Sequence, residues 1–270
     1  MNPINRFKSF LHLATVTQWM HLEKEHRERP PAGGAERAKV MGLYVLAMLV
    51  LIAIEYLPRD SYNLLVKEHV PRDLRRFGRD LWWCWFVIAS YSVLPALYCS
   101  RVLKLSLKDL GLSPRGFLKH AWIYVGLFLI VFPFVVGVSG TEVFQSKYPL
   151  FGSRSGADVH LDRFLIWEFS YALQFVALEF FFRGVLLFGA VRVLGPWAIV
   201  FMVTPYMMIH FGKPGAEAVG AILAGAALGL VALRTRSIYA GMAIHIAVAW
   251  SMDLLALWRK GKLGNLLGFD

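Results

Sequence analysis

Two stretches of twenty residues, 81–100 and 121–140, contain no charged side chain. An α-helix of that length spans about 30 Å, which is the thickness of the hydrocarbon layer of a bilayer. Hydrophobic residues make up 57% of the chain and charged residues 17%, a composition far from that of a soluble domain. The sequence therefore predicts an all-α, polytopic membrane helix bundle.

The apolar stretches divide the chain into about seven expected transmembrane helices. Polar loops, prolines and glycines separate them. The sixth is rich in glycine and alanine, and Ala221, Gly225 and Gly229 recur on one face, which predicts close packing against a neighbouring helix. The expected spans are 41–57, 81–100, 121–140, 164–191, 197–211, 218–233 and 238–258.

The N-terminal 40 residues differ from the rest. Residues 1–29 place aromatic and aliphatic side chains among lysines and arginines, which is typical of an amphipathic helix on a membrane surface. They lack the long uncharged run of a signal peptide. A Pro- and Gly-rich linker follows, so residues 1–40 are expected to precede a membrane domain at 41–270, whose motif-bearing core is about 164–258.

The formal net charge of +11 is concentrated in the N-terminal segment and the early loops. Basic residues at such positions contact lipid headgroups and set topology. No basic patch is interleaved with a soluble fold, so the sequence argues against a nucleic-acid partner. The expected partners are the bilayer and a membrane-associated protein or peptide.

Four ionisable residues lie within the apolar segments of the second half: Glu179, Arg183, His210 and His245. A charge near the centre of a membrane helix costs on the order of 2.5–3.5 kcal/mol. Glu179 and Arg183 are four residues apart, so they share one helix face and can pair. Such groups usually face the bundle interior, where we expect them to converge. A carboxylate and an imidazole are the groups needed to activate water for peptide-bond hydrolysis.

Other chemistries remain open. Two histidines and Glu179 could bind a metal, but the chain contains no His-Glu-x-x-His sequence, and we expect no metal and no cofactor. A serine triad is set aside because there is no Gly-x-Ser-x-Gly elbow. A proton-coupled transporter would also use buried Glu and His, and it is the main alternative on physical grounds.

Three short sequences resemble the motifs of one family. Residues 178–184, Leu-Glu-Phe-Phe-Phe-Arg-Gly, are similar to the Glu-Glu-x-x-x-Arg signature of the CPBP family, the CAAX-protease and bacteriocin-processing membrane proteins. Residues 206–210 resemble its Phe-x-x-x-His motif, and 245–249 its His-x-x-x-Asn motif. The resemblance covers roughly residues 167–255.

This resemblance implies an intramembrane glutamic endopeptidase that works without a metal and admits substrate through a groove open to the membrane. Members process prenylated C-termini or peptides, or confer bacteriocin immunity. Carried over, Glu179 is the second motif glutamate, Arg183 orients it, and His210 and His245 supply the imidazoles. The expected location is the bacterial cytoplasmic (inner) membrane, as an integral multi-pass protein.

Two positions depart from the family pattern. Leu178 replaces the first glutamate, which usually acts as general base, and Ala249 replaces the asparagine that is often assigned to oxyanion stabilisation. Glu168 and Asp253 share helix faces with Glu179 and His245, respectively. Either could compensate for a missing motif residue, but we interpret both as interfacial or packing groups. A non-catalytic relative that binds a membrane peptide, as an immunity or maturation-partner protein, is therefore a second hypothesis.

Overall fold

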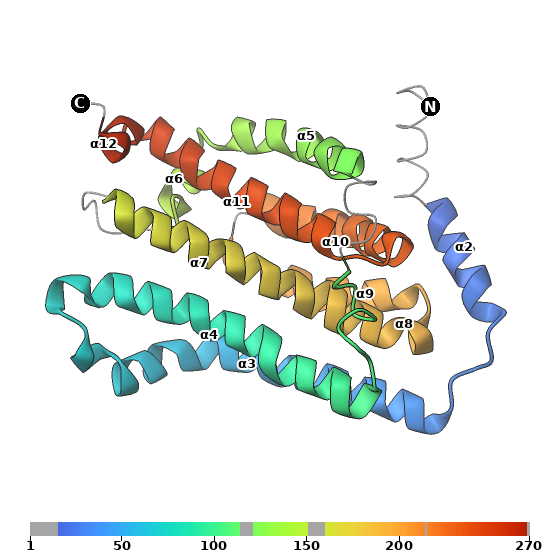
Figure 1. Cartoon of the computed structure of the whole chain (residues 1–270). Coiled ribbons are helices and arrows are strands. Elements are labelled where there is room, and N and C mark those ends of the chain that lie inside the picture. Colours follow the sequence, from blue (N-terminus) through green and yellow to red (C-terminus); the bar gives the residue numbers. More distant parts are fainter. Residues whose placement is uncertain (1–15, 114–120, 151–159, 214, 269–270) are drawn as a thin grey trace. The chain divides into compact units, whose positions relative to one another are not determined.

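The structure is a computed structural model that describes residues 16–113, 121–150, 160–213 and 215–268. The described residues form helices joined by turns (Figure 1), which confirms the predicted all-α membrane bundle. The elements are α2 (Val16–Arg27), α3 (Gly34–Leu65), η1 (Lys67–His69), η2 (Arg72–Leu74), α4 (Arg75–Tyr98), η3 (Cys99–Leu103), α5 (Ala121–Val138), α6 (Glu142–Lys147), α7 (Leu161–Glu179), η5 (Phe180–Phe188), α8 (Gly189–Leu194), α9 (Trp197–Met208), α10 (Gly215–Thr235), α11 (Tyr239–Arg259) and α12 (Leu263–Leu267).

Among the described residues, four helical segments are long and apolar enough to cross a bilayer. They are Gly34–Leu65, Arg72–Leu103, Glu217–Thr235 and Tyr239–Arg259. Tyr124–Val138 and Trp197–Met208 are apolar but shorter. The protein is therefore an integral membrane protein, while the count of seven spans stays a prediction.

The chain divides into two compact units. Unit 1 comprises residues 1–52, 90–123 and 178–241, and unit 2 comprises 53–89, 124–177 and 242–270. Helix α7 passes from unit 2 into unit 1 near its last residue.

Unit 1 is built around η5, a π-helix of nine residues in which every side chain is buried. The sequence predicts one regular helix over 164–191, so the π-helical turn is a difference from expectation. It packs against α8, α9 and α10. Gly184 permits a close approach here, because a Cβ at this position would lie 3.0 Å from the Leu110 carbonyl oxygen. No face of η5 is left for lipid, and its charged residue is thereby kept in the protein interior.

Helices α9 and α10 pack through the small residues of α10. A Cβ at Gly225 would lie 3.1 Å from Tyr206 and Val203, and one at Gly229 would lie 3.2 Å from Met202. Ala221 is buried as well. The predicted packing role of this face is confirmed.

The N-terminal helix α2 also belongs to unit 1. Trp19 packs edge-on against Trp197, with ring centroids 5.3 Å apart, and Glu25 pairs with Arg234 at 3.5 Å. Residues 1–15 of the expected amphipathic segment lie outside the described residues, and its placement on the membrane surface stays a prediction.

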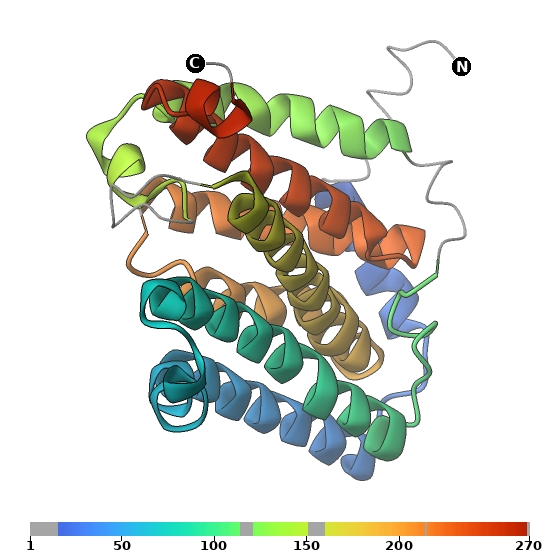
Figure 2. The same cartoon turned by 60° about the vertical axis from the view of Figure 1, so that its left-hand side comes forward.

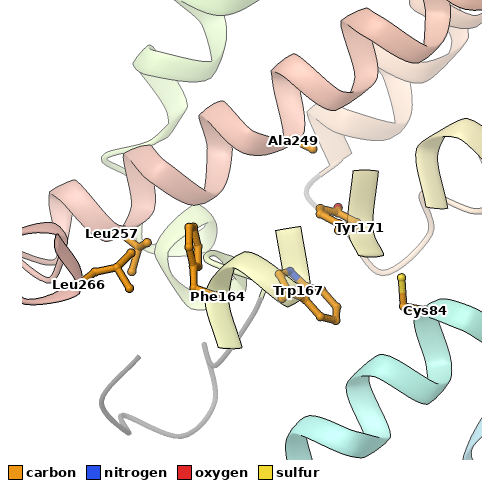
Figure 3. Close-up of a cluster of buried hydrophobic side chains, with 7 residues drawn as sticks. All are labelled: Cys84, Phe164, Trp167, Tyr171, Ala249, Leu257 and Leu266. Carbon is orange, nitrogen blue, oxygen red and sulfur yellow. The ribbon is translucent and has the colours of Figure 1, made fainter. Parts of the chain in front are cut away.

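In unit 2, α7 lies between α4 and α11, as Figures 1 and 2 show. The Cys84 thiol of α4 donates to the Ser170 carbonyl of α7 at 3.2 Å. On the other side, the Trp250 indole of α11 donates to the Glu168 carbonyl at 3.3 Å. Figure 3 shows the apolar cluster that fills this unit, made by Cys84, Phe164, Trp167, Tyr171, Ala249, Leu257 and Leu266.

Candidate active site

The candidate site in unit 1 begins where α7 ends and η5 begins. Arg183 Nη1 donates to Glu179 Oε1 at 2.9 Å, and both side chains are buried, with exposed fractions of 1% and 0%. The predicted pair thus forms. A buried ion pair gains stability only where further contacts offset its desolvation, so the surroundings of Arg183 decide how firmly Glu179 is held.

Tyr206 also contacts the guanidinium of Arg183. The Arg183 Cζ lies 4.3 Å from the centroid of the Tyr206 ring, in a cation–π arrangement. Tyr206 is itself buried and packs edge-on against Phe182 at 5.2 Å. The aromatic face therefore holds Arg183 from the side of α9.

His210 lies next to Tyr206, just after the end of α9. Its Nδ1 is 2.9 Å from the Tyr206 carbonyl oxygen, and the two rings meet edge-on at 5.1 Å. A carbonyl oxygen only accepts hydrogen bonds, so in the neutral ring this contact places the proton on Nδ1. Nε2 is then the ring nitrogen that can accept a proton.

Gly241, the third residue of α11, completes the surroundings of Glu179 within unit 1. A Cβ at this position would overlap the Glu179 carboxylate. The backbone of α11 therefore approaches the acid closely, as only glycine allows.

The structure thus brings three of the four predicted residues into one connected group: Glu179, Arg183 and, through Tyr206, His210. His245 belongs to unit 2, where its ring stacks on Phe175 with centroids 5.6 Å apart and planes 9° apart. It is half-buried and follows Gly241 by one helical turn of α11.

Two residues of the group were not singled out from the sequence. In the sequence, Tyr206 is only the first residue of the second motif. Its aromatic ring, one turn before His210, is the feature that indicates a cation–π partner for Arg183. Gly241 carries no functional group, and its signal in the sequence is a small residue one turn before His245.

The two departures from the family motifs are apolar packing positions. Leu178 is buried, and Ala249 belongs to the apolar cluster of unit 2. Glu168 and Asp253 are buried too, with exposed fractions of 7% and 0%, which fits their interpretation as interfacial or packing groups. Their packing role is correct, because they contact each other between α7 and α11.

Within the described residues, no group of three His, Cys, Asp or Glu side chains is placed to hold a metal ion. The group around Glu179 instead combines one carboxylate, one guanidinium and one imidazole, which can take up and release protons and hold a polar substrate.

Residues 161–251 match a family model described as type II CAAX prenyl endopeptidase Rce1-like. The match contains all four predicted site residues and confirms the resemblance stated from the three motifs. Neither the curated proteins nor the solved structures contain a match to the chain.

Proposed function

Residues 161–251 match the Rce1-like model of the type II CAAX prenyl endopeptidases, and on this premise we propose that the chain is an intramembrane peptidase. It hydrolyses a peptide bond of a membrane-associated protein or peptide. The observation that carries the proposal is the buried Glu179–Arg183 pair, joined through Tyr206 to His210.

In this mechanism Glu179 accepts a proton from a water molecule, whose oxygen then attacks the scissile carbonyl. Arg183 holds the carboxylate in place through the 2.9 Å hydrogen bond. Its Nε makes no hydrogen bond to a described group and offers a buried donor for the substrate carbonyl. Because Glu179 and Arg183 are both buried, the mechanism requires that water and substrate enter from between the helices.

The imidazoles deliver the proton to the leaving amine. When Nδ1 of His210 donates to the Tyr206 carbonyl, its Nε2 carries no proton and can accept one. His210 can therefore pass a proton on to the leaving amine. His245 is the second proposed imidazole, and this role rests on the resemblance of residues 245–249 to the family's His-x-x-x-Asn motif. The proposed location remains a bacterial cytoplasmic membrane.

The test uses the full chain in lipid nanodiscs with a farnesylated CAAX peptide, and the same peptide without its prenyl group. Mass spectrometry of the products should show new termini with the wild-type protein. Glu179→Gln and His210→Ala should each abolish them while the protein still inserts and elutes as one species. The exposed-site variants Glu142→Gln and His160→Ala serve as matched controls and should cleave normally. Cleavage that survives both site changes would show that these residues are not the catalytic ones.

One observation favours a second candidate function. Leu178 and Ala249 are buried apolar residues where the family motifs carry a glutamate and an asparagine. A relative that binds the peptide without cutting it fits this loss of polar groups. It predicts saturable binding of the farnesylated peptide by both the wild type and Glu179→Gln, with no new termini.

A further inference from the structure

A second pair of buried ionisable groups lies in unit 2, away from the proposed catalytic residues in sequence. Glu168 of α7 and Asp253 of α11 interact through their carboxyl groups. Asp253 is fully buried and Glu168 nearly so. Neither belongs to the motifs that resemble the family, and Asp253 lies outside the matched residues.

The hydrogen-bonding capacity of the two carboxyl groups favours one proton between them. An ionised carboxylate only accepts hydrogen bonds, so two of them side by side have no donor to share. Neither oxygen of Glu168 accepts a hydrogen bond from a nitrogen or hydroxyl donor among the described residues. Asp253, by contrast, accepts from the Leu150 amide at 2.9 Å and interacts with the Trp167 indole. One proton on the pair gives Glu168 a hydrogen to donate and removes the repulsion between two buried charges.

Burial disfavours a negative charge at Asp253, and three neighbours offset part of that cost. The Leu150 amide and the Trp167 indole interact with the carboxyl group, and Lys260 attracts its charge. Partial burial lowers the pKa of Lys260, the charge of Lys262 lowers it further, and the Asp253 charge opposes both. Lys260 in turn donates to the Tyr148 carbonyl at 2.5 Å.

The pair lies at a junction of three elements. It joins α7 to α11, where the Trp250 indole also bonds the Glu168 carbonyl. Through Leu150, Asp253 holds the segment that follows α6. Phe175 lies seven residues after Glu168 on α7, and His245 lies eight residues before Asp253 on α11. The Phe175 and His245 rings stack on each other, so the two helices run antiparallel. The register of α7 against α11 thus decides where the His245 ring lies.

We propose that Glu168 and Asp253 share one proton and act as positioning residues, fixing α7 against α11 and thereby placing His245. The catalytic importance of placing His245 rests on the proposed function. The shared proton and the register of α7 against α11 do not depend on it. Because the folded protein then binds a proton that the unfolded chain releases at neutral and alkaline pH, stability should fall as pH rises.

The experiment compares the wild type with Glu168→Gln, Glu168→Ala and the surface control Glu142→Gln, all as full chains in nanodiscs. Difference infrared spectroscopy should detect the C=O stretch of a buried carboxylic acid in the wild type and in Glu142→Gln. The band should be missing from Glu168→Gln. A band that persists in Glu168→Gln, or that is absent from the wild type, would overturn the shared proton.

Thermal unfolding at increasing pH gives the second measurement. The wild type should lose several degrees of unfolding temperature towards alkaline pH. Glu168→Gln should not, because its amide donates to Asp253 at every pH. Glu168→Ala should be destabilised at all pH values. If Glu168→Gln and the wild type lost the same number of degrees of unfolding temperature at alkaline pH, the proposal would be contradicted. This comparison holds even if Glu168→Ala fails to fold.

The positioning of His245 is tested with the farnesylated peptide. Glu168→Ala should lower kcat with little change in KM. Glu168→Gln should have a kcat close to that of the wild type, and its kcat should fall less at alkaline pH. Unchanged kcat in Glu168→Ala would refute the positioning role. Should the wild type cleave no peptide, the proposed function fails by itself, while the infrared and unfolding results still decide whether the pair shares a proton.

Discussion

The backbone of Gly241 lies against the carboxylate of Glu179, so closely that a Cβ at position 241 would overlap it. On its other side, the same carboxylate accepts from Arg183 at 2.9 Å. Glu179 is thus confined between the start of α11 and the first turn of η5, both within unit 1. Its position depends on a residue that carries no functional group.

We expect Gly241→Ala to abolish peptide cleavage, because the added methyl group must displace the carboxylate from Arg183. Overpacking of this kind typically costs about 1–3 kcal/mol, which exceeds what alanine gains over glycine within a helix. Cleavage rates and chemical unfolding of the purified protein measure both effects. Gly126→Ala is the control, since nothing lies within 4 Å of its added Cβ. Wild-type activity in Gly241→Ala would contradict the confinement of Glu179.

Removal of Arg183 should be strongly destabilising. Arg183→Ala leaves the Glu179 carboxylate buried without its partner, and breaking a buried pair in this way costs about 3–5 kcal/mol. The double change Glu179→Gln with Arg183→Met removes both charges and should cost less than Arg183→Ala alone. Equilibrium unfolding of Glu179→Gln, Arg183→Met and the double variant forms the cycle. Additive costs would mean that the ion pair contributes no coupling.

The contact between α9 and α10 can be tested through Gly225. A methyl group at this position would lie 3.1 Å from Tyr206, whose ring supports Arg183. Gly225→Ala should therefore lower both the unfolding temperature and cleavage. Gly220→Ala on the same helix meets nothing within 4 Å and should be neutral or slightly stabilising. Equal behaviour of the two variants would refute close packing at Gly225.

A pH effect outside the membrane spans is expected at Asp109. The Ser106 hydroxyl and amide donate to its carboxylate at 2.6 and 2.9 Å, and these hydrogen bonds hold the pKa of Asp109 below its ordinary value. A lowered folded-state pKa adds stability that is fully present above the unfolded value of about 4 and is lost as pH falls through the folded value. The turn at 106–111 should therefore loosen only in acid. NMR titration of the Asp109 carboxyl measures this, and Ser106→Ala should return its titration towards the ordinary range.

The apolar stretches and the spacing of a few polar residues were enough to predict the helical class, the membrane location and the family resemblance. Helix formation and burial in lipid follow from local composition, which the chain carries in runs of about twenty residues. The Glu179–Arg183 pair was also predictable, because a separation of four residues places two side chains together in any helix.

Other features depended on contacts between distant segments. The sequence did not predict that η5 is a π-helix with every residue buried, that Tyr206 holds the Arg183 guanidinium, or that Gly241 confines Glu179. It predicted Glu168 and Asp253 to be interfacial or packing groups but did not predict that they contact each other. Helical periodicity fixes which face of its own helix a residue occupies, but not which neighbour that face meets. That choice is made by the packing of large and small side chains between helices, and only the tertiary structure decided it.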